Sequence, residues 1–293
     1  MSTSFSNYWQ NKIDALDVHY HARPDSFKRR YNVIEAGKIF SKNSMGCVLK
    51  NHLGSTTSLA SLAQEFDLPV FGSIVLNSIS GGINITSIKQ ALCQYSFYQN
   101  GRLIVHLPTV VKTNHSSVMN RKFSNTSVEK YSQEVNRITT SNGTLKSEIS
   151  ALIAFSQEND IVISTGHASK REIYSLLEFI DKYGGGCRLM LNQPANPITG
   201  MSAKELIALG KHDWLFIEQT ALTVLLKYQS FDDFTLAVKK IPNLVYSSDL
   251  GQLCQIDIED WIKQTNYWFD TMGVSKERYK EISLFSPLRM LSP

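Results

Sequence analysis

Cysteine is scarce in this chain, and the residues that occur are scattered. They are Cys47, Cys93, Cys187 and Cys254, with no Cys-x-x-Cys pair among them. This spacing argues against a structural zinc site built from thiolates. We therefore expect four free thiols, packed as small apolar groups in a reducing compartment.

Long apolar runs and a strong excess of one charge are also missing. No run approaches the ~20 apolar residues that span a bilayer, and residues 1–14 contain no apolar signal segment. Thirty Lys and Arg residues stand against 26 Asp and Glu, a net charge of +4 that is too small and too dispersed to indicate nucleic-acid binding. We expect a cytoplasmic protein without membrane or nucleic-acid partners.

The one compact basic run is Lys28, Arg29 and Arg30. Such a run is typical of a solvated loop face, which is the interpretation that we favour. The alternative is that it steers an anionic substrate toward a nearby cleft.

Short apolar runs alternate with longer amphipathic stretches along the 293 residues. The runs are residues 15–19, 46–50, 70–76, 103–107, 161–164, 188–191, 214–217 and 244–247. Helices are expected over 31–41, 58–66, 85–98, 146–157, 169–183, 202–209 and 234–239. This alternation predicts parallel strands with helical crossovers, and no linker divides the chain. We expect a single α/β domain over 1–293, a (β/α)8 TIM-like barrel.

One segment interrupts the alternation after the fourth strand. Residues 112–147 are rich in Ser, Thr and Asn and are too long for a routine connection. They contain Ser141-Asn142-Gly143, which predicts a hairpin turn. This insertion is either a lid over the site or a surface excursion without a catalytic role.

Metal-binding residue types gather where the strands end, which is where barrels of this kind carry their catalytic groups. The first strand ends in His19-Tyr20-His21, and alternation along a strand points its two imidazoles to the same side. His52, His167 and Asp249 follow the second, fifth and eighth strands. Imidazole and carboxylate ligands suit zinc, manganese or iron(II). Three or four such ligands with an open position would activate a water molecule, which is hydrolase chemistry.

Other strand ends offer supporting residues. Glu218 follows the seventh strand as a ligand or general base, and Gln193 follows the sixth as a hydrogen-bonding partner for substrate or water. Lys50 is a contact for a substrate carboxylate, a carbamate that bridges metals, or an exposed amine. His106 either lines the mouth of the site or is a structural residue. We expect His115 and His212 to face solvent.

Taken together, these stretches resemble the metal-dependent amidohydrolase and PHP-type barrels, and within them an uncharacterised branch of hydrolases. The resemblance runs from Asp17 to the end of the chain. The stretches that carry it are 17–25, 48–52, 71–77 with Gly81-Gly82, 164–167 and 248–252. It implies a distorted barrel with one or two divalent ions held by His19, His21, His167 and Asp249, and with His52 as a further ligand.

The chain departs from that family at two positions. Gln193 stands before Pro194 where relatives carry His-Pro, and Gln219 follows Glu218 where they favour Glu-His. Glutamine is a poor ligand and cannot take a proton, which argues against a two-metal site.

We predict a metal-dependent hydrolase, with zinc as the favoured ion, that cleaves an amide, amidine, lactone or ester bond of a small anionic or cyclic substrate. Asp249 or Glu218 moves the proton, and Arg23 and Lys50 orient the substrate. Further substrate contacts are expected from Gln193, Asn77 and Thr109. The alternatives are a metal-dependent decarboxylase or lyase and a barrel that binds a metabolite without turnover. Barrels of this type often form homodimers, so a homodimer is a further expectation.

Overall fold

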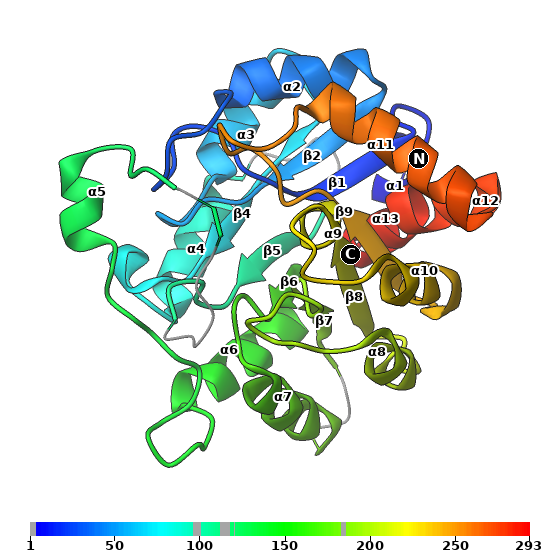
Figure 1. Cartoon of the computed structure of the whole chain (residues 1–293). Coiled ribbons are helices and arrows are strands. Elements are labelled where there is room, and N and C mark those ends of the chain that lie inside the picture. Colours follow the sequence, from blue (N-terminus) through cyan, green and yellow to red (C-terminus); the bar gives the residue numbers. More distant parts are fainter. Residues whose placement is uncertain (1–3, 96–100, 112–117, 120, 183–185) are drawn as a thin grey trace.

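The computed structural model describes residues 4–95, 101–111, 118–119, 121–182 and 186–293. Strands alternate with helices through most of this chain, with the helices around the outside of the strands (Figure 1). The strands are β1 (Ala15–Tyr20), β2 (Met45–Leu49), β3 (Val70–Phe71), β4 (Ser73–Val75), β5 (Leu103–His106), β6 (Ile161–Ser164), β7 (Arg188–Leu191), β8 (Leu215–Thr220) and β9 (Leu244–Ser247). Every expected strand is present, which confirms the predicted parallel α/β class.

The strands form two parallel sheets whose order follows the sequence. One sheet has the order β1-β2-β3 and the other runs from β4 to β9. The predicted third strand is divided at Gly72 into β3 and β4. At the far edge, the segment after β9 joins β1, because the Asp249 amide donates to the His19 carbonyl at 2.9 Å and the His21 amide to the Leu250 carbonyl at 3.0 Å.

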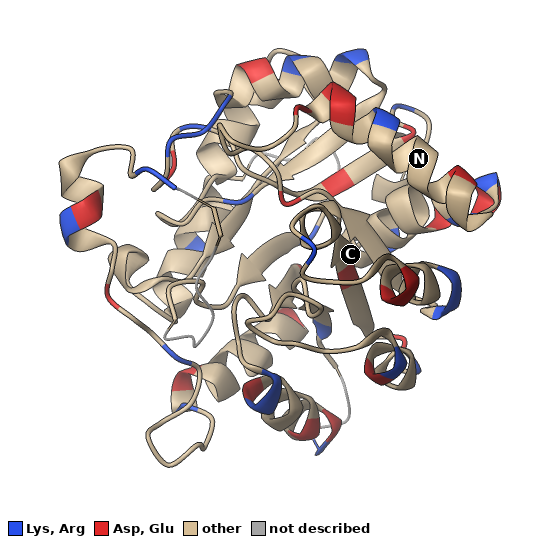
Figure 2. Cartoon of the chain, in the orientation of Figure 1, with Lys and Arg blue, Asp and Glu red and all other residues tan. Residues whose placement is uncertain are grey.

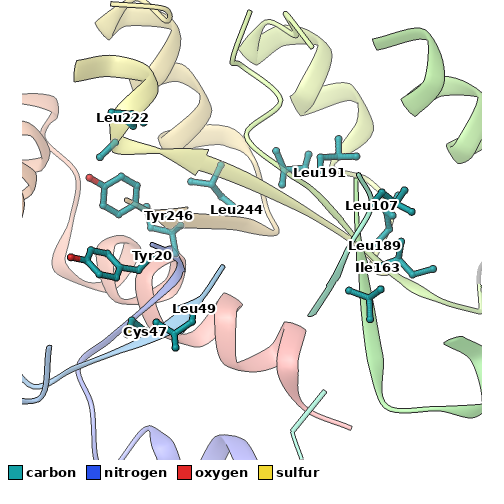
Figure 3. Close-up of a cluster of buried hydrophobic side chains, with 14 of the residues drawn as sticks. Tyr20, Cys47, Leu49, Leu107, Ile163, Leu189, Leu191, Leu222, Leu244 and Tyr246 are labelled. Carbon is teal, nitrogen blue, oxygen red and sulfur yellow. The ribbon is translucent and has the colours of Figure 1, made fainter. Parts of the chain in front are cut away.

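The strands bury apolar side chains on both faces, one against the other strands and one against the helices. On one face, strands of both sheets meet in a single apolar cluster. Its strand members are Leu16, Val18, Val48, Phe71, Ile104, Val162, Met190, Phe216 and Val245. The alternate residues pack toward the helices, as Tyr20, Leu49, Ile163, Leu189 and Leu244 do in Figure 3. Burial on both faces explains why the strands have near-continuous apolar sequences.

Each expected helix is present. These helices are α2 (Val33–Lys42), α3 (Thr57–Gln64), α4 (Ile85–Cys93), α6 (Ser147–Glu158), α7 (Lys170–Lys182), α8 (Ala203–Leu209) and α10 (Phe231–Lys240). The helix predicted over 85–98 ends at Cys93, and the predicted helical residues 96–98 and 183 lie outside the described part of the chain. Local capping fixes several starts: the Asn32 side chain accepts from the Glu35 amide while Glu35 accepts from the Asn32 amide, a complete capping box.

Sequence patterns did not predict the helices at the two ends of the chain or the short α9 (Ala221–Leu225). The terminal helices are α1 (Phe5–Trp9), α11 (Ile258–Met272), α12 (Lys276–Lys280), a π-helical turn over Glu281–Phe285 and α13 (Ser286–Leu291). Phe5 and Trp9 join Leu284 and Leu288 in the apolar cluster that the strands share. The chain ends therefore cover one end of the strands and leave the opposite end for the site.

The long segment after β5 contains α5 (Thr126–Tyr131) and the predicted hairpin. Thr139 and Leu145 form an antiparallel bridge around Gly143, whose φ of 87° suits glycine. The hairpin prediction is thus confirmed. The interpretations of 112–147 as a lid or as a surface excursion stay predictions, and residues 112–117 and 120 of this segment lie outside the described residues. The interpretation of 1–293 as one domain also stays a prediction.

Surface and thiol positions complete the fold. All four cysteines are free; Cys47 and Cys187 are buried, but Cys93 and Cys254 are exposed, so the expectation that all four pack inside was wrong. Charges of both signs lie along the outer helices (Figure 2). Among the described residues, no helix has the length and apolar character needed to cross a bilayer.

The loop after β9 leaves no room for a side chain at Gly251. This residue has φ +123°, and an added Cβ would lie 1.9 Å from the His21 carbonyl oxygen. We expect Gly251→Ala to lower the free energy of unfolding by about 3 kcal/mol or more, measured by urea denaturation. The control is Gly273→Ala, with φ +64° and no atom within 4 Å, which should cost only about 1 kcal/mol. Equal losses would show that backbone strain alone, and not the contact with His21, sets the effect.

Candidate metal centre

Two histidines and an aspartate meet where β1 and β9 end. His19 lies in β1, His21 follows it, and Asp249 follows β9, so the side-chain alternation of β1 places both imidazoles together as predicted. Asp249 Oδ1 lies 3.1 Å from His19 Nε2 and 3.2 Å from His21 Nε2. The ligand atoms of this group all lie within 4.8 Å of one another, so the three residues are able to hold one metal ion.

Glu218 fixes the orientation of His19. Its Oε1 lies 2.9 Å from His19 Nδ1, and both side chains are buried. The same carboxylate accepts hydrogen bonds from Ser247 Oγ at 2.7 Å and from the Gln193 amide at 2.7 Å. Its oxygens are therefore occupied by neighbours. With Nδ1 engaged by Glu218, the buried Nε2 of His19 is left to face Asp249.

The carboxylates make this group attractive to positive charge. Burial alone would lower the pKa of His19, but the nearby Asp249 and Glu218 carboxylates outweigh it and raise the pKa to about 9. Burial alone would raise the pKa of Asp249, but the His19 and His21 imidazoles lower it well below its usual range. The pKa of His21 instead falls to about 4, through burial and the nearby Arg29 guanidinium.

A second group lies beside the first and shares His21. Asp25 Oδ2 is 3.5 Å from His21 Nδ1, and Asp25 Oδ1 is 3.3 Å from His52 Nδ1. The ligand atoms of His21, Asp25 and His52 also lie close enough to hold an ion. His52 thus belongs to this group and is stacked on His21, with ring centroids 5.0 Å apart.

Asp25 already has several strong partners. Arg29 donates from Nε to Asp25 Oδ2 at 2.6 Å, with Nη2 2.5 Å from the same oxygen. The amides of Ser26 and His52 donate to Oδ1 at 2.7 and 2.8 Å. Burial would raise the pKa of Asp25, but Arg29 and its other partners hold it well below its usual range. Because Arg29 neutralises this carboxylate, the second group attracts a cation less than the first.

The backbone around the site adopts unusual conformations. Asp249 and Gln193 have positive φ values of 55° and 37°, which non-glycine residues rarely adopt. The loop of Asp249 is held by Ser248, whose amide and hydroxyl both donate to the buried Asp17 carboxylate, at 3.0 and 2.5 Å. Such strained positions cluster at functional sites, where the surroundings enforce them.

A cavity opens over the first group and brings in further predicted residues. Its walls include Lys50, His167, Gln193 and Asp249. Lys50 is buried and donates from Nζ to Asn192 Oδ1 at 2.9 Å, so the interpretation as an exposed amine was wrong. Gln193 Nε2 lies 3.3 Å from His167 Nε2. Burial lowers the pKa of both His167 and Lys50.

His167 does not join either of the two groups able to hold an ion among the described residues. It shares the cavity with His19 and His21, at the end of β6 where the sequence predicted it. Its predicted role as a ligand stays a prediction.

Three predicted substrate contacts have different surroundings. Arg23 is exposed and pairs with Glu35 at 2.9 Å, and it is not part of the cavity wall. Asn77 is buried and ties loops together, since its Oδ1 accepts from the Thr109 amide at 2.7 Å and its Nδ2 donates to the His52 carbonyl at 2.9 Å. Thr109 lines a second cavity that adjoins the first.

The remaining histidines divide between core and surface. His106 is buried at the end of β5, with Nδ1 2.8 Å from Ser164 Oγ. His212 is half exposed and lies 3.8 Å from Asp181, as expected for a surface residue. His115 lies outside the described residues.

Gln219, predicted to mark a departure from a standard active site, is not part of the cavity wall. It is paired with Tyr246 in the β8–β9 register, and Tyr246 packs toward the helices. A residue next to Glu218 must point to the opposite side of the strand. A histidine at this position would therefore also point away from the site.

Sequence reasoning missed four polar residues of the site. Arg29 was assigned to a solvated loop face but is buried, because Asp25 compensates its charge. Asp25 and Asn192 were given no role, and Arg121 reaches the cavity from the segment after β5. The spacing of Asp25 and Arg29 by four residues was the only local signal, and outside a helix it does not predict contact.

These features define a parallel α/β protein with buried histidine and aspartate groups able to bind a metal ion. Residues 14–218 match a family of unknown function, DUF6282, and the chain belongs to this family. No curated protein and no solved structure matched the chain. Asp249, the third member of the first group, lies beyond the matched residues.

The buried Arg29–Asp25 pair should matter strongly for stability. We expect Arg29→Met to lower the free energy of unfolding by about 3–5 kcal/mol, because it leaves a buried carboxylate without its cation. The measurement is urea denaturation of the purified chain. The matched control is Arg23→Met, which breaks the exposed pair with Glu35 and should leave the urea midpoint unchanged. A similar loss in both variants would contradict the importance of burial.

Proposed function

We propose that this protein is a metal-dependent hydrolase of small molecules, with its active site at the His19–His21–Asp249 group. The observation that carries the proposal is the state of His19. Glu218 occupies its Nδ1, while Nε2 is buried and faces Asp249 Oδ1 at 3.1 Å. Histidines that bind metals are commonly held in this way, with a carboxylate on the second nitrogen.

We further propose that the two sheets together form a closed, distorted (β/α)8 barrel. Only Gly72 separates β3 from β4, and the segment after β9 hydrogen-bonds to β1. Strands of both sheets also share one apolar cluster, as the interior of a barrel would require. In such a barrel the site lies at the carboxyl ends of the strands, where the His19–His21–Asp249 group is found.

Two imidazole nitrogens and a carboxylate oxygen suit zinc, with manganese and iron(II) as alternatives. His19, His21 and Asp249 would hold the ion, and His167 lies in the same cavity as a further donor. When bound, the ion supplies a Lewis acid that promotes attack by water at neutral pH.

The other polar residues then take distinct tasks. Asp249 lines the cavity and is 12 % exposed at its side chain, so it is placed to accept a proton from water. Glu218 has no exposed surface and its oxygens are engaged, so it acts as a positioning residue for His19. Lys50 is part of the cavity wall, where its ammonium group is held by Asn192 and orients an oxygen of the substrate.

Gln193 is the main departure from a two-metal hydrolase. It faces the cavity beside His167, and an amide neither coordinates a transition metal well nor takes a proton. This observation favours a single catalytic ion. A glutamine at this position still supports the His19–His21–Asp249 group, because its backbone amide donates a hydrogen bond to Glu218, the carboxylate that orients His19.

The proposal predicts a zinc site that depends on His19. After removal of metal with a chelator, the native protein should take up about one equivalent of zinc and gain thermal stability, because a ligand bound only to the folded state stabilises it. His19→Ala and Asp249→Asn should lose both effects, measured by metal analysis and thermal unfolding. His212→Ala, at the half-exposed surface, is the control that should behave like the native chain. A native protein that neither binds zinc, manganese or iron(II) nor changes its stability would rule out the proposal.

Glu218→Gln tests the positioning role separately. The amide keeps the size of the side chain but removes the charge that orients His19, so zinc affinity should fall about 10- to 100-fold. Competition with a zinc-binding dye measures this change. The control is Glu205→Gln on α8, where the carboxylate pairs with Lys170 away from the site. An affinity unchanged in Glu218→Gln would show that this carboxylate does not support a metal ligand.

A further inference from the structure

Arg121 stands between the active-site cavity and a second cavity beside it. Both cavities include Arg121, His52, His167 and Ile198 in their walls, so they adjoin one another. The guanidinium of Arg121 has no ion pair or hydrogen bond among the described residues, although it is only partly exposed. A partly buried cation without an anionic partner is costly unless a ligand supplies one.

The cavity that contains the metal group has an excess of cationic side chains. Arg29, Lys50 and Arg121 line it, whereas Asp249 is the acidic residue in its wall. Asp25 neutralises Arg29, and Lys50 donates to the neutral Asn192. Arg121 therefore remains the cation most available to an anionic group.

The chain around Arg121 is held in place by the loop after β1. The Lys28 amide donates to the Lys122 carbonyl and the Ser124 amide to the Ser26 carbonyl, both at 2.9 Å. The guanidinium lies over the Phe27 ring, 5.1 Å from its centroid. Phe27 also stacks on Phe123, with ring centroids 5.3 Å apart. These contacts fix a planar group with five donors at the junction of the two cavities.

The second cavity has a different character from the first. Its wall includes the apolar side chains of Phe27, Val110, Val111 and Ile198. The same wall also carries the polar side chains of Ser26, Thr109, Ser132 and Gln133. Apolar surface combined with placed polar groups is typical of small-molecule sites. A ligand that spans both cavities would thus have an anionic group near Arg121 and an apolar part beside the valines.

We propose that Arg121 binds the anionic oxygens of a carboxylate or phosphoryl group on the substrate, whose apolar part occupies the second cavity. This inference rests on the proposed function, because it identifies a substrate class for that site. It assigns specificity to the segment after β5, which brings Arg121 to the junction. A guanidinium donates two parallel hydrogen bonds to such groups, which gives direction as well as attraction.

The test measures binding of phenylphosphonate and benzoate to the full chain by titration calorimetry, with and without zinc. The native protein should bind at least one of them, and the stronger ligand identifies a phosphoryl or a carboxylate group. Arg121→Gln should weaken that binding at least tenfold. Methylphosphonate or acetate should bind several-fold more weakly than its aromatic counterpart, because each lacks the apolar part.

The matched control is Lys122→Gln, an exposed neighbour with the same change of charge. It should bind within twofold of the native affinity, and all variants should show native thermal unfolding. Equal affinity in the native and Arg121→Gln proteins, or no binding by the native protein, would overturn the inference. Zinc uptake separates the two proposals. If Arg121→Gln takes up zinc normally and its anion affinity equals that of the native protein, only this inference is removed. If the native protein binds the anion but takes up no zinc, only the metal site is removed.

Discussion

The burial of the Glu218 carboxylate constrains the rest of the site. A buried charge is tolerated only when its oxygens are satisfied, and Glu218 meets this need with partners from three other parts of the fold. His19 comes from β1, Ser247 from β9 and the Gln193 amide from the loop after β7. Since β1 and β8 belong to different sheets, this carboxylate also links the sheets across the site. The orientation of His19, and with it the cavity beside Asp249, depends on that network being complete.

Much of the fold could be predicted because short apolar runs with two buried faces are a strong local signal. The same alternation correctly brought His19 and His21 together, and applied one residue further along β8 it would have shown that Gln219 faces away from Glu218. The positions of Arg29 and Arg121 in the cavity wall could not be predicted in this way. Their loops are positioned by long-range contacts, such as the stacking of Phe27 on Phe123, that leave no periodic pattern in the sequence.

The two neighbouring histidine groups show how one scaffold treats similar residues differently. Both contain His21, yet the close contacts of the Asp249 carboxylate are with imidazoles, whereas Asp25 is paired directly with the permanent charge of Arg29. A guanidinium stays charged at any pH that the protein survives, so the Asp25 carboxylate serves as the permanent ion-pair partner of Arg29. Asp249 keeps its oxygens toward the cavity, in a backbone conformation that its neighbours enforce.

The separation of His19 and Asp249 along the chain has a consequence for biosynthesis. The two imidazoles are synthesised well before their acidic partner, which follows β9, and helix α13, which adds Leu288 to the shared apolar cluster, comes later still. Contacts between such distant residues form late, because a large loop must close first. If the proposed metal site is correct, the nascent chain would carry both histidines for most of its synthesis without their acidic partner, and the ion would bind only after β9 and Asp249 have been made.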